Sequence, residues 1–492
     1  MTEESFFEKF ISKAVSKYRE YKAPFLSSLI AGFIAYGFFF TNKLIQQDDA
    51  AAMFAKGASL TSGRWGLDIM SLIYPDFSMP WVYGIITLVI LSLSSCIIIS
   101  CVRLENKVLQ GIFSMLFTTL STVTGMFCLP FLATSYATAA ILSVLSVYFI
   151  DKNKAVSIVL LALSISIYQA YIALAAGILV VVLIKRVLIE NEDAKDVIKD
   201  GVIYVLFLAL SVIAYFAVTL ILNKVFGVEL ITYGTSEYKI LKRIRVAYTA
   251  FAGFFYKGYF SLIPSDAALV FNIIAVALAG YAFVSLFINL EGTFNKILSA
   301  VLLVLLPLAI NCMYLASSVD VLGALVFHSF SCMYLLICVL FDGRFKTIRG
   351  TVSVFLTLAV ICNIYFANEI SLKMYLQTSE VKAFYEGVIS AAISDENYVV
   401  GDEIAIIGDE TDASYISDAI DSSNFKGLTA EDPYNMYTRN EFIELYLGFK
   451  GPFAGYDRRN YLSSTDEFKS MAQYPEDGSI KKIDGSMVIK LQ

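Results

Sequence analysis

Two adjacent carboxylates, Asp48 and Asp49, follow the first apolar run of the chain and are the residues best suited to chemistry. Acidic side chains near a bilayer are costly, and two neighbouring acids repel each other, so the pair needs partners or a use. At a membrane surface, one carboxylate could act as a general base on a hydroxyl nucleophile, while the other orients the acceptor or binds a cation. The alternative is that both cap a juxtamembrane helix at 48–60, because acids are favoured in a first helical turn.

An arginine and a tryptophan, Arg64 and Trp65, follow the acidic pair by about fifteen residues. A guanidinium suits phosphate recognition and an indole face suits stacking on a sugar ring, so the two are candidate substrate-binding residues. The alternative is a tryptophan anchored in the aromatic belt of a membrane, beside an exposed arginine. Asp68 and Asp76 lie in the same loop and are second-rank acidic candidates.

A basic cluster within 223–265 comprises Lys239, Lys242, Arg243 and Arg245. Apolar and basic residues mix there at helical spacing, as in a helix that lies in the interface plane of a membrane. The cluster could bind the phosphate of a lipid-linked substrate. It could equally attract anionic lipid head groups, at roughly 1 kcal/mol per charge.

Polar residues also interrupt a long apolar run, at Tyr168, Gln169 and Tyr171. They could line a substrate cleft, since non-helical backbone at membrane depth is tolerated where it borders a polar cavity. They could as well satisfy a helix end. His328, the only histidine, lies in an apolar segment and is interpreted as a hydrogen-bonded packing residue. A single histidine excludes a His-rich metal site, and it excludes a Ser-His-Asp triad unless His328 serves it.

The composition indicates that a membrane positions these residues. Of the 492 residues, 58% are hydrophobic and 16% charged, whereas soluble proteins average about 45–50% and about 25%. Several apolar runs are long enough to cross a hydrocarbon core of roughly 30 Å as helices. Eleven transmembrane helices are predicted, at 24–45, 80–101, 109–128, 133–150, 155–168, 170–186, 201–222, 266–290, 297–316, 321–341 and 350–367.

The fifth and sixth of these helices could instead be one crossing, because 155–184 is a single apolar run. One crossing would place the basic residues at 152–154 and at 185–186 on opposite sides of the membrane. Two short helices that turn at 168–171 keep both basic groups on one side. The two-helix interpretation therefore agrees with the charge of the loops.

The positive-inside rule orients the chain, since every short loop on one side of the predicted bundle is basic. That side is cytoplasmic and includes the N-terminal arm at 1–23, which is too polar to be a cleavable signal. The transmembrane domain at 24–367 then carries its long loops, 46–79 and 223–265, on the outer face. The prediction is a multi-pass protein of the cell (plasma or inner) membrane with an extracytoplasmic C-terminus.

Residues 368–492 are predicted to form a small extracytoplasmic α/β domain, because charged and turn residues return there. A buried strand is expected at 404–407 and helices at 369–394 and 439–448. The end of the chain, 478–491, alternates around an Asp-Gly turn signal, as in a β-hairpin.

No cofactor is predicted, and a divalent metal could bind but is not indicated. The seven cysteines lie in or beside apolar runs without metal-ligand spacing, so they are interpreted as small buried hydrophobes rather than a disulfide framework. The sequence contains no Walker loop, no Gly-x-Gly-x-x-Gly between a strand and a helix, and no zinc motif. An enzyme acting outside the cell would lack nucleotide sugars, so an activated donor would have to be carried in the membrane.

Four stretches resemble the bacterial GtrII-like glucosyltransferases, a family known for O-antigen serotype conversion. In chain order they are the acidic pair followed by Gly-Arg-Trp at 63–65, Ser-Ile-Tyr-Gln-Ala-Tyr at 166–171, the strand segment at 404–408, and Met-Ala-Gln-Tyr-Pro-Glu-Asp-Gly-Ser-Ile at 471–480 with the hairpin after it. The resemblance would cover nearly the whole chain.

The resemblance implies the GT-C class of multispan enzymes, which carry a catalytic aspartate in the first extracytoplasmic loop. The implied fold is an all-α multispan membrane protein of about eleven helices with a small C-terminal α/β domain. The implied reaction moves a hexose, glucose in the family, from a polyprenyl-phosphate carrier to a cell-surface glycan. Asp48 or Asp49 would deprotonate the acceptor hydroxyl. Arg64 or the cluster at 242–245 would neutralise the charge of the leaving phosphate, so that no general acid is needed to protonate it.

The implied partners are the polyprenyl-phosphate sugar, the glycan acceptor, membrane lipids, an enzyme that charges the donor and a flippase, but no nucleic acid. The alternative function is a transporter or flippase of lipid-linked sugars. Such a protein would need polar residues within its spans and pseudo-symmetric halves, and these spans are almost free of charge. A third alternative is a scaffold whose outer domain binds a partner.

Overall fold

A computed structural model describes residues 6–45, 60–73, 79–231, 239–257, 265–317, 322–408 and 438–491, with side chains from residue 19 onward except those of 256 and 257. The chain divides into two compact units. The larger unit holds 6–41 and the described residues between 60 and 369. The smaller unit holds 42–45, 370–408 and 438–491.

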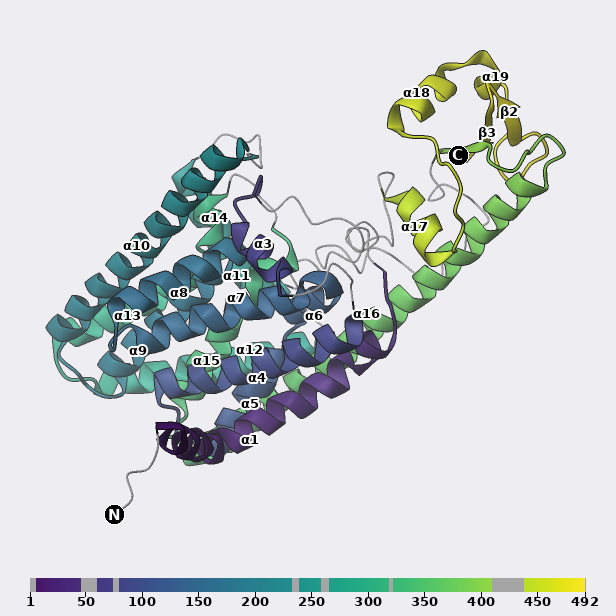
Figure 1. The fold of residues 1–492 in the computed structure, drawn as a ribbon. Coiled ribbons are helices and arrows are strands. Elements are labelled where there is room, and N and C mark those ends of the chain that lie inside the picture. Colours follow the sequence, from purple (N-terminus) through teal and green to yellow (C-terminus); the bar gives the residue numbers. More distant parts are fainter. Residues whose placement is uncertain are drawn as a thin grey trace. The chain divides into compact units, whose positions relative to one another are not determined.

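The larger unit is a bundle of helices (Figure 1). In chain order it contains α1 (Phe6–Thr41), α3 (Trp65–Ser71), α4 (Pro80–Val102), α5 (Lys107–Thr119), α6 (Ser121–Phe127), α7 (Pro130–Phe149), α8 (Lys154–Ile167), α9 (Tyr171–Leu188), α10 (Ala194–Phe226), α11 (Ile240–Ala252), the π-helix η1 (Gly253–Lys257), α12 (Asp266–Asn289), α13 (Thr293–Ile310), α14 (Met313–Ala316), the 3-10 helix η3 (Ala324–Phe330), α15 (Ser331–Leu340) and the first part of α16 (Lys346–Ser394).

Eight of the described helices are long and apolar enough to cross a membrane, which makes this a multi-pass membrane protein. The pair α5 and α6, bent by 46°, would make a ninth span, and α8 and the η3–α15 segment are shorter apolar helices. Each predicted span falls largely on helix, but the number eleven stays a prediction. The span predicted at 109–128 bends because Leu120 leaves helical geometry, and Asn363 Oδ1 accepts a hydrogen bond from the freed Ser121 N–H at 2.9 Å.

The apolar run at 155–184 is two helices, α8 and α9. The chain leaves α8 at Tyr168, whose backbone is extended (φ −152°, ψ 114°), and α9 begins at Tyr171. Asp151 precedes α8 and Lys185 lies in the last turn of α9, and both residues line one cavity. Both basic ends therefore lie at the same end of the bundle, which confirms the two-helix interpretation. With 14 residues, α8 is about 21 Å long and shorter than a hydrocarbon core.

Serine hydroxyls join neighbouring helices in the core of the larger unit. The helix α7 packs against α4, α8 and α9 (Figure 1). Ser164 Oγ of α8 donates a hydrogen bond to the carbonyl of Ala139 on α7 at 2.7 Å. Ser143 Oγ of α7 donates to the carbonyl of Tyr171 on α9 at 2.8 Å. Such interhelical bonds satisfy polar groups that neither lipid nor water can reach.

The smaller unit is a three-stranded sheet with helices around it. After the second part of α16 it contains β1 (Glu403–Ile407), α17 (Arg439–Tyr446), α18 (Tyr456–Ser464), α19 (Asp466–Lys469), β2 (Ile480–Ile483) and β3 (Ser486–Lys490). The strand order is β1-β3-β2, with β1 parallel and β2 antiparallel to β3. Asp484 and Gly485 both have positive φ, 47° and 83°, as a two-residue hairpin turn requires.

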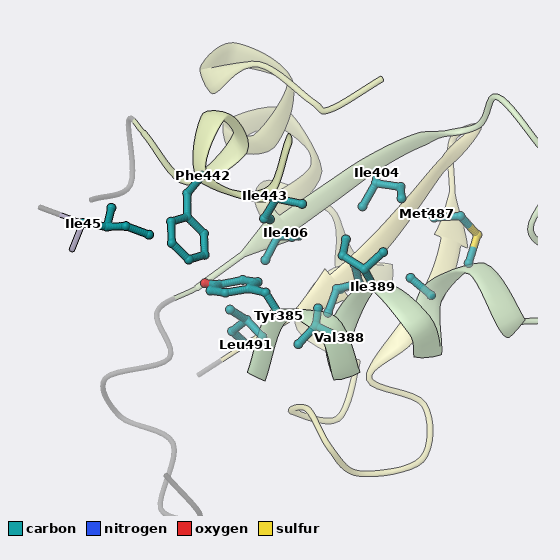
Figure 2. Packing of buried hydrophobic residues seen from close by; sticks show 12 residues of the cluster. Ile45, Tyr385, Val388, Ile389, Ile404, Ile406, Phe442, Ile443, Met487 and Leu491 are labelled. Carbon is teal, nitrogen blue, oxygen red and sulfur yellow. The ribbon is translucent and has the colours of Figure 1, made fainter. Parts of the chain in front are cut away.

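The predicted α/β fold of this unit is confirmed, including its strand at 404–407, its helices at 369–394 and 439–448 and its final hairpin. Its extracytoplasmic location stays a prediction. The core packs α16 and α17 against the sheet (Figure 2). One member of this core, Ile45, comes from the distant N-terminal part of the chain.

Candidate functional site

The loop that carries Arg64 and Trp65 packs against α8 and α10. Tyr215 of α10 donates a hydrogen bond from its hydroxyl to the carbonyl of Gly63 at 3.0 Å. Gly66, in the first turn of α3, lies so close to α8 that an added Cβ would stand 2.8 Å from the backbone nitrogen of Ile167. Only a glycine permits this approach, which brings Arg64 to the turn between α8 and α9.

Arg64 and Gln169 contact each other at this turn. Arg64 Nε donates to Gln169 Oε1 at 3.3 Å, and its guanidinium lies 5.1 Å from the centre of the Tyr168 ring. The amide of Gln169 in turn donates to the carbonyl of Ser62 at 2.9 Å. Both Arg64 and Gln169 are half-buried. Within the described part of the chain, no oxygen accepts a hydrogen bond from the two terminal nitrogens of Arg64. A fixed cation with two open donors can bind an anion.

Trp65 is buried, with 7% of its surface exposed, and its indole N–H donates to Thr219 Oγ1 at 3.2 Å. Stacking on a sugar would need an open indole face. In the structure the indole anchors the loop to α10, beside a half-buried Arg64 rather than the exposed arginine of the second interpretation, and the role of Trp65 in substrate binding stays a prediction. Tyr215 and Thr219 were not predicted as site residues. Their signal in the sequence is a pair of polar residues four apart in an apolar helix.

An aromatic row extends from the turn into the bundle. Tyr168 stacks on Tyr136, with ring centres 4.5 Å apart, and meets Tyr171 edge-on at 6.1 Å. Tyr171 is in turn 6.0 Å from the ring of His328. His328 is buried, and its Nε2 lies 3.0 Å from the carbonyl of Phe117, so this nitrogen carries the proton and donates. These contacts agree with the interpretation of His328 as a packing residue.

Of the four predicted acidic residues, the structure describes only Asp68. Asp48, Asp49 and Asp76 lie outside the described residues. Asp68 lies in the first turn of α3, is half-buried, and its carbonyl accepts a hydrogen bond from Ser71 Oγ at 2.8 Å. The carboxylates predicted to act as a base therefore stay predictions.

The basic residues at α11 lie on different faces of the helix. Arg243 is fully buried on the same face as Ala247 and Ala250, whereas Lys242 and Arg245 are exposed; Lys239, just before the helix, is also exposed. The helix packs against α13, α14 and η1, a different set of elements from those around Arg64. Arg243 therefore does not share one surface with the three exposed members of the cluster. The helix expected here is confirmed, while its interface-plane orientation stays a prediction.

A second polar region lies at the opposite ends of α8, α9 and α10. It is a cavity of about 360 Å³ lined by charged residues from the loops that follow α4, α7 and α9. Arg186 pairs there with Glu192 at 2.6 Å and with Asp200 at 2.8 Å, and Lys185 pairs with Glu190 at 3.5 Å. The Arg186 guanidinium holds the pKa of Glu192 below its ordinary value. These pairs tie the ends of α9 and α10 together.

No group of three or more histidine, cysteine, aspartate or glutamate residues suited to a metal ion occurs among the described residues. The seven cysteines are free thiols. The fold and the site thus define a helical membrane protein in which the turn between α8 and α9 holds a half-buried arginine against a tyrosine and a glutamine.

A comparison with protein-family models matches residues 37–341 to the family described as glucosyl transferase GtrII. The chain belongs to this family, and it is therefore a membrane glycosyltransferase. No curated protein and no solved structure matches the chain. The matched range includes the acidic pair and the turn at 166–171, whereas the resembling stretches at 404–408 and 471–480 lie outside it.

Proposed function

We propose that the protein moves glucose from a polyprenyl-phosphate donor to a cell-surface glycan at the outer face of the membrane. Family membership supports glucosyl transfer. The outer location of the Arg64 site is supported by the charge of the loops. The basic residues near 152 and 185 lie at the opposite end of α8 and α9 from the turn at Tyr168, and basic loops are cytoplasmic.

The geometry of Arg64 is the observation that carries the donor assignment. Gln169 accepts a hydrogen bond from the Nε of Arg64 and Tyr168 lies beside its guanidinium, and neither residue accepts a hydrogen bond from the two terminal nitrogens. Two parallel N–H donors match two oxygens of a phosphate, and a preorganised guanidinium loses little freedom on binding.

In the proposed reaction, Asp48 or Asp49 removes the proton from the acceptor hydroxyl. The hydroxyl oxygen then forms a bond to the anomeric carbon of glucose, and the bond from that carbon to the phosphate oxygen breaks. The electron pair leaves with the phosphate, whose added negative charge Arg64 stabilises. Lys242 and Arg245, exposed on α11, are the second candidates for this charge. Trp65 acts by holding the loop to α10.

The base assignment is tested in membrane vesicles that contain the full chain, polyprenyl-phosphate glucose with labelled sugar, and acceptor glycan. We expect Asp48→Asn or Asp49→Asn to reduce the transfer rate by about a hundredfold or more. Asp477→Asn, at an exposed position of the smaller unit, is the matched control and should transfer at the normal rate. Normal transfer by both variants of the acidic pair would show that neither carboxylate is the base.

The donor assignment needs a separate arm of this experiment, without acceptor glycan. A transferase leaves the labelled donor on its original side of the vesicle when no acceptor is present. Movement of the intact donor across the membrane, without formation of a new glycosidic bond, would instead support a transporter of lipid-linked sugars.

A further inference from the structure

Four hydrogen bonds connect the loop that carries Arg64, the turn between α8 and α9, and the helix α10. Tyr215 of α10 is only 5% exposed and donates from its hydroxyl to the carbonyl of Gly63 at 3.0 Å. The same hydroxyl accepts a hydrogen bond from the amide nitrogen of Gln169 at 3.3 Å. This nitrogen also donates to the carbonyl of Ser62 at 2.9 Å, and the amide oxygen accepts from Arg64 Nε at 3.3 Å.

The direction of each bond in this network is fixed by groups that can play only one role. A backbone carbonyl only accepts a hydrogen bond, and a guanidinium only donates. Because the carbonyl of Gly63 takes the single proton of the Tyr215 hydroxyl, this hydroxyl can only accept from Gln169. The amide of Gln169 must therefore turn its nitrogen to Tyr215, which directs its oxygen to Arg64. An amide turned the other way would place a donor against the Nε–H of Arg64.

Gly63 permits the close approach of α10 to this loop. Its φ of 68° lies in the left-handed region, and an added Cβ would collide with the hydroxyl of Tyr215. The hydroxyl therefore reaches the backbone of the residue directly before Arg64. Tyr215 thus holds both the backbone next to Arg64 and the amide that orients its side chain.

We propose that Tyr215 is a positioning residue for donor recognition, which acts through Gln169 to hold the Arg64 guanidinium ready for the phosphate of the lipid carrier. This inference rests on the proposed function, in which Arg64 binds that phosphate. Loss of the hydroxyl would free the amide of Gln169 to rotate. The guanidinium would then have to be ordered when the phosphate binds, and that ordering would weaken the affinity.

The neutral charge of Gln169 is part of the same arrangement. A glutamate has nearly the same size, but its two oxygens only accept hydrogen bonds. At position 169 it would pair with Arg64 as Glu192 pairs with Arg186, and less positive charge would remain for a phosphate. An amide whose direction is set by Tyr215 orients the guanidinium and leaves its charge available.

The experiment measures the affinity of polyprenyl phosphate, without sugar, for full-length variants in vesicles. We expect Tyr215→Phe to weaken binding about fivefold and Gln169→Glu to weaken it about tenfold or more. The matched control is Tyr204→Phe, which removes the same hydroxyl from a buried tyrosine of the same helix, at the cavity near Arg186, and should bind within twofold of the wild type. Wild-type affinity in Tyr215→Phe, or an equal loss in Tyr204→Phe, would overturn the positioning role. Wild-type affinity in Gln169→Glu would overturn the requirement for a neutral partner.

A double-mutant cycle separates positioning of Arg64 from a general contribution to folding. If Tyr215 acts through Arg64, Tyr215→Phe should cause no further loss of affinity in an Arg64→Gln background. The same fivefold loss in both backgrounds would show that the hydroxyl acts independently of Arg64, and the proposal would fail. Unchanged binding by Arg64→Gln alone would instead contradict the proposed function, so the two failures are distinguishable.

Discussion

Two arginines of the larger unit lie at opposite ends of α8 and α9 and are held in different ways. Arg186 is paired with two carboxylates, Glu192 and Asp200, at 2.6 and 2.8 Å. Arg64 has a neutral amide, Gln169, at 3.3 Å and the face of Tyr168. Neutral partners orient the Arg64 guanidinium without neutralising its charge, whereas Arg186 is already neutralised by the protein. The difference indicates that Arg186 has a structural role and that Arg64 can receive an anionic ligand.

The largest effects are expected from changes at Arg64, including one that keeps its charge but removes its planar pair of donors. Arg64→Lys should lower kcat/KM for the lipid-linked donor by about 10²-fold, because a point charge replaces bidentate, preorganised donors. Arg64→Gln should lower it further. The measurement is transfer of labelled glucose in vesicles at matched protein amounts. Wild-type kinetics for Arg64→Lys would contradict a role of Arg64 in binding the donor phosphate, and with it the contrast between Arg64 and Arg186.

A smaller loss is expected when the loop is displaced without a change in Arg64. In Gly66→Ala the new Cβ would stand 2.8 Å from the backbone nitrogen of Ile167, so the loop must shift. We expect transfer to fall about tenfold, because misplacement of a binding group by a fraction of an ångström weakens transition-state contacts. Gly37→Ala in α1 is the control, since open space surrounds that position. Equal rates for both variants would show that the close approach does not position Arg64.

The structural role of Arg186 predicts a loss of stability without loss of donor recognition. Arg186→Gln leaves Glu192 and Asp200 without their cation, and the expected cost is about 1–3 kcal/mol, discounted for partial exposure. The melting temperature of the purified protein in detergent should therefore fall, while KM for the donor stays within twofold. Arg344→Gln, at an exposed position, is the control. A raised donor KM with an unchanged melting temperature would reverse the assignment of the two arginines.

The smallest effect concerns pH. Glu192 has a lowered pKa because Arg186 donates to it, so its contribution to stability is present above the ordinary carboxyl pKa of about 4.3 and is lost as pH falls through the lowered value. The wild type should lose about 0.5 kcal/mol more than Arg186→Gln between pH 5 and pH 3, after allowance for solvent screening. Melting temperatures of the two proteins across this range provide the measurement. Parallel pH profiles would show that the pair does not contribute.

The turn between α8 and α9 was predictable from local features of the sequence. These are the basic residues on both sides of the apolar run and the polar residues within it. The basic groups near 152 and 185 favoured an even number of crossings between them over a single one, and Tyr168 and Gln169 were the polar break in the run. The hairpin at 480–490 was predictable for a similar local reason, its Asp-Gly turn. Each of these features depends on residues that are neighbours in the sequence.

The contacts that give the site its geometry join distant residues and could not be read from local patterns. Gln169 reaches Ser62 across 107 positions, and Trp65 reaches Thr219 across 154. The burial of Arg243 is a similar case, because helical spacing shows that it faces away from Lys242 but not which face meets α13 and α14. The packing of Ile45 into the smaller unit has no sequence signal beyond an apolar pair at the end of a predicted span.

The most direct measurement is the affinity of polyprenyl phosphate, without sugar, for the full chain in vesicles. The probe contains the lipid and the phosphate that Arg64 is proposed to bind, and it requires neither acceptor nor turnover. We predict that Arg64→Gln weakens binding about tenfold or more, while Arg245→Gln and Arg186→Gln stay within twofold of the wild type. Unchanged binding by Arg64→Gln, with the loss found in Arg245→Gln, would place the donor phosphate at α11 and contradict the account.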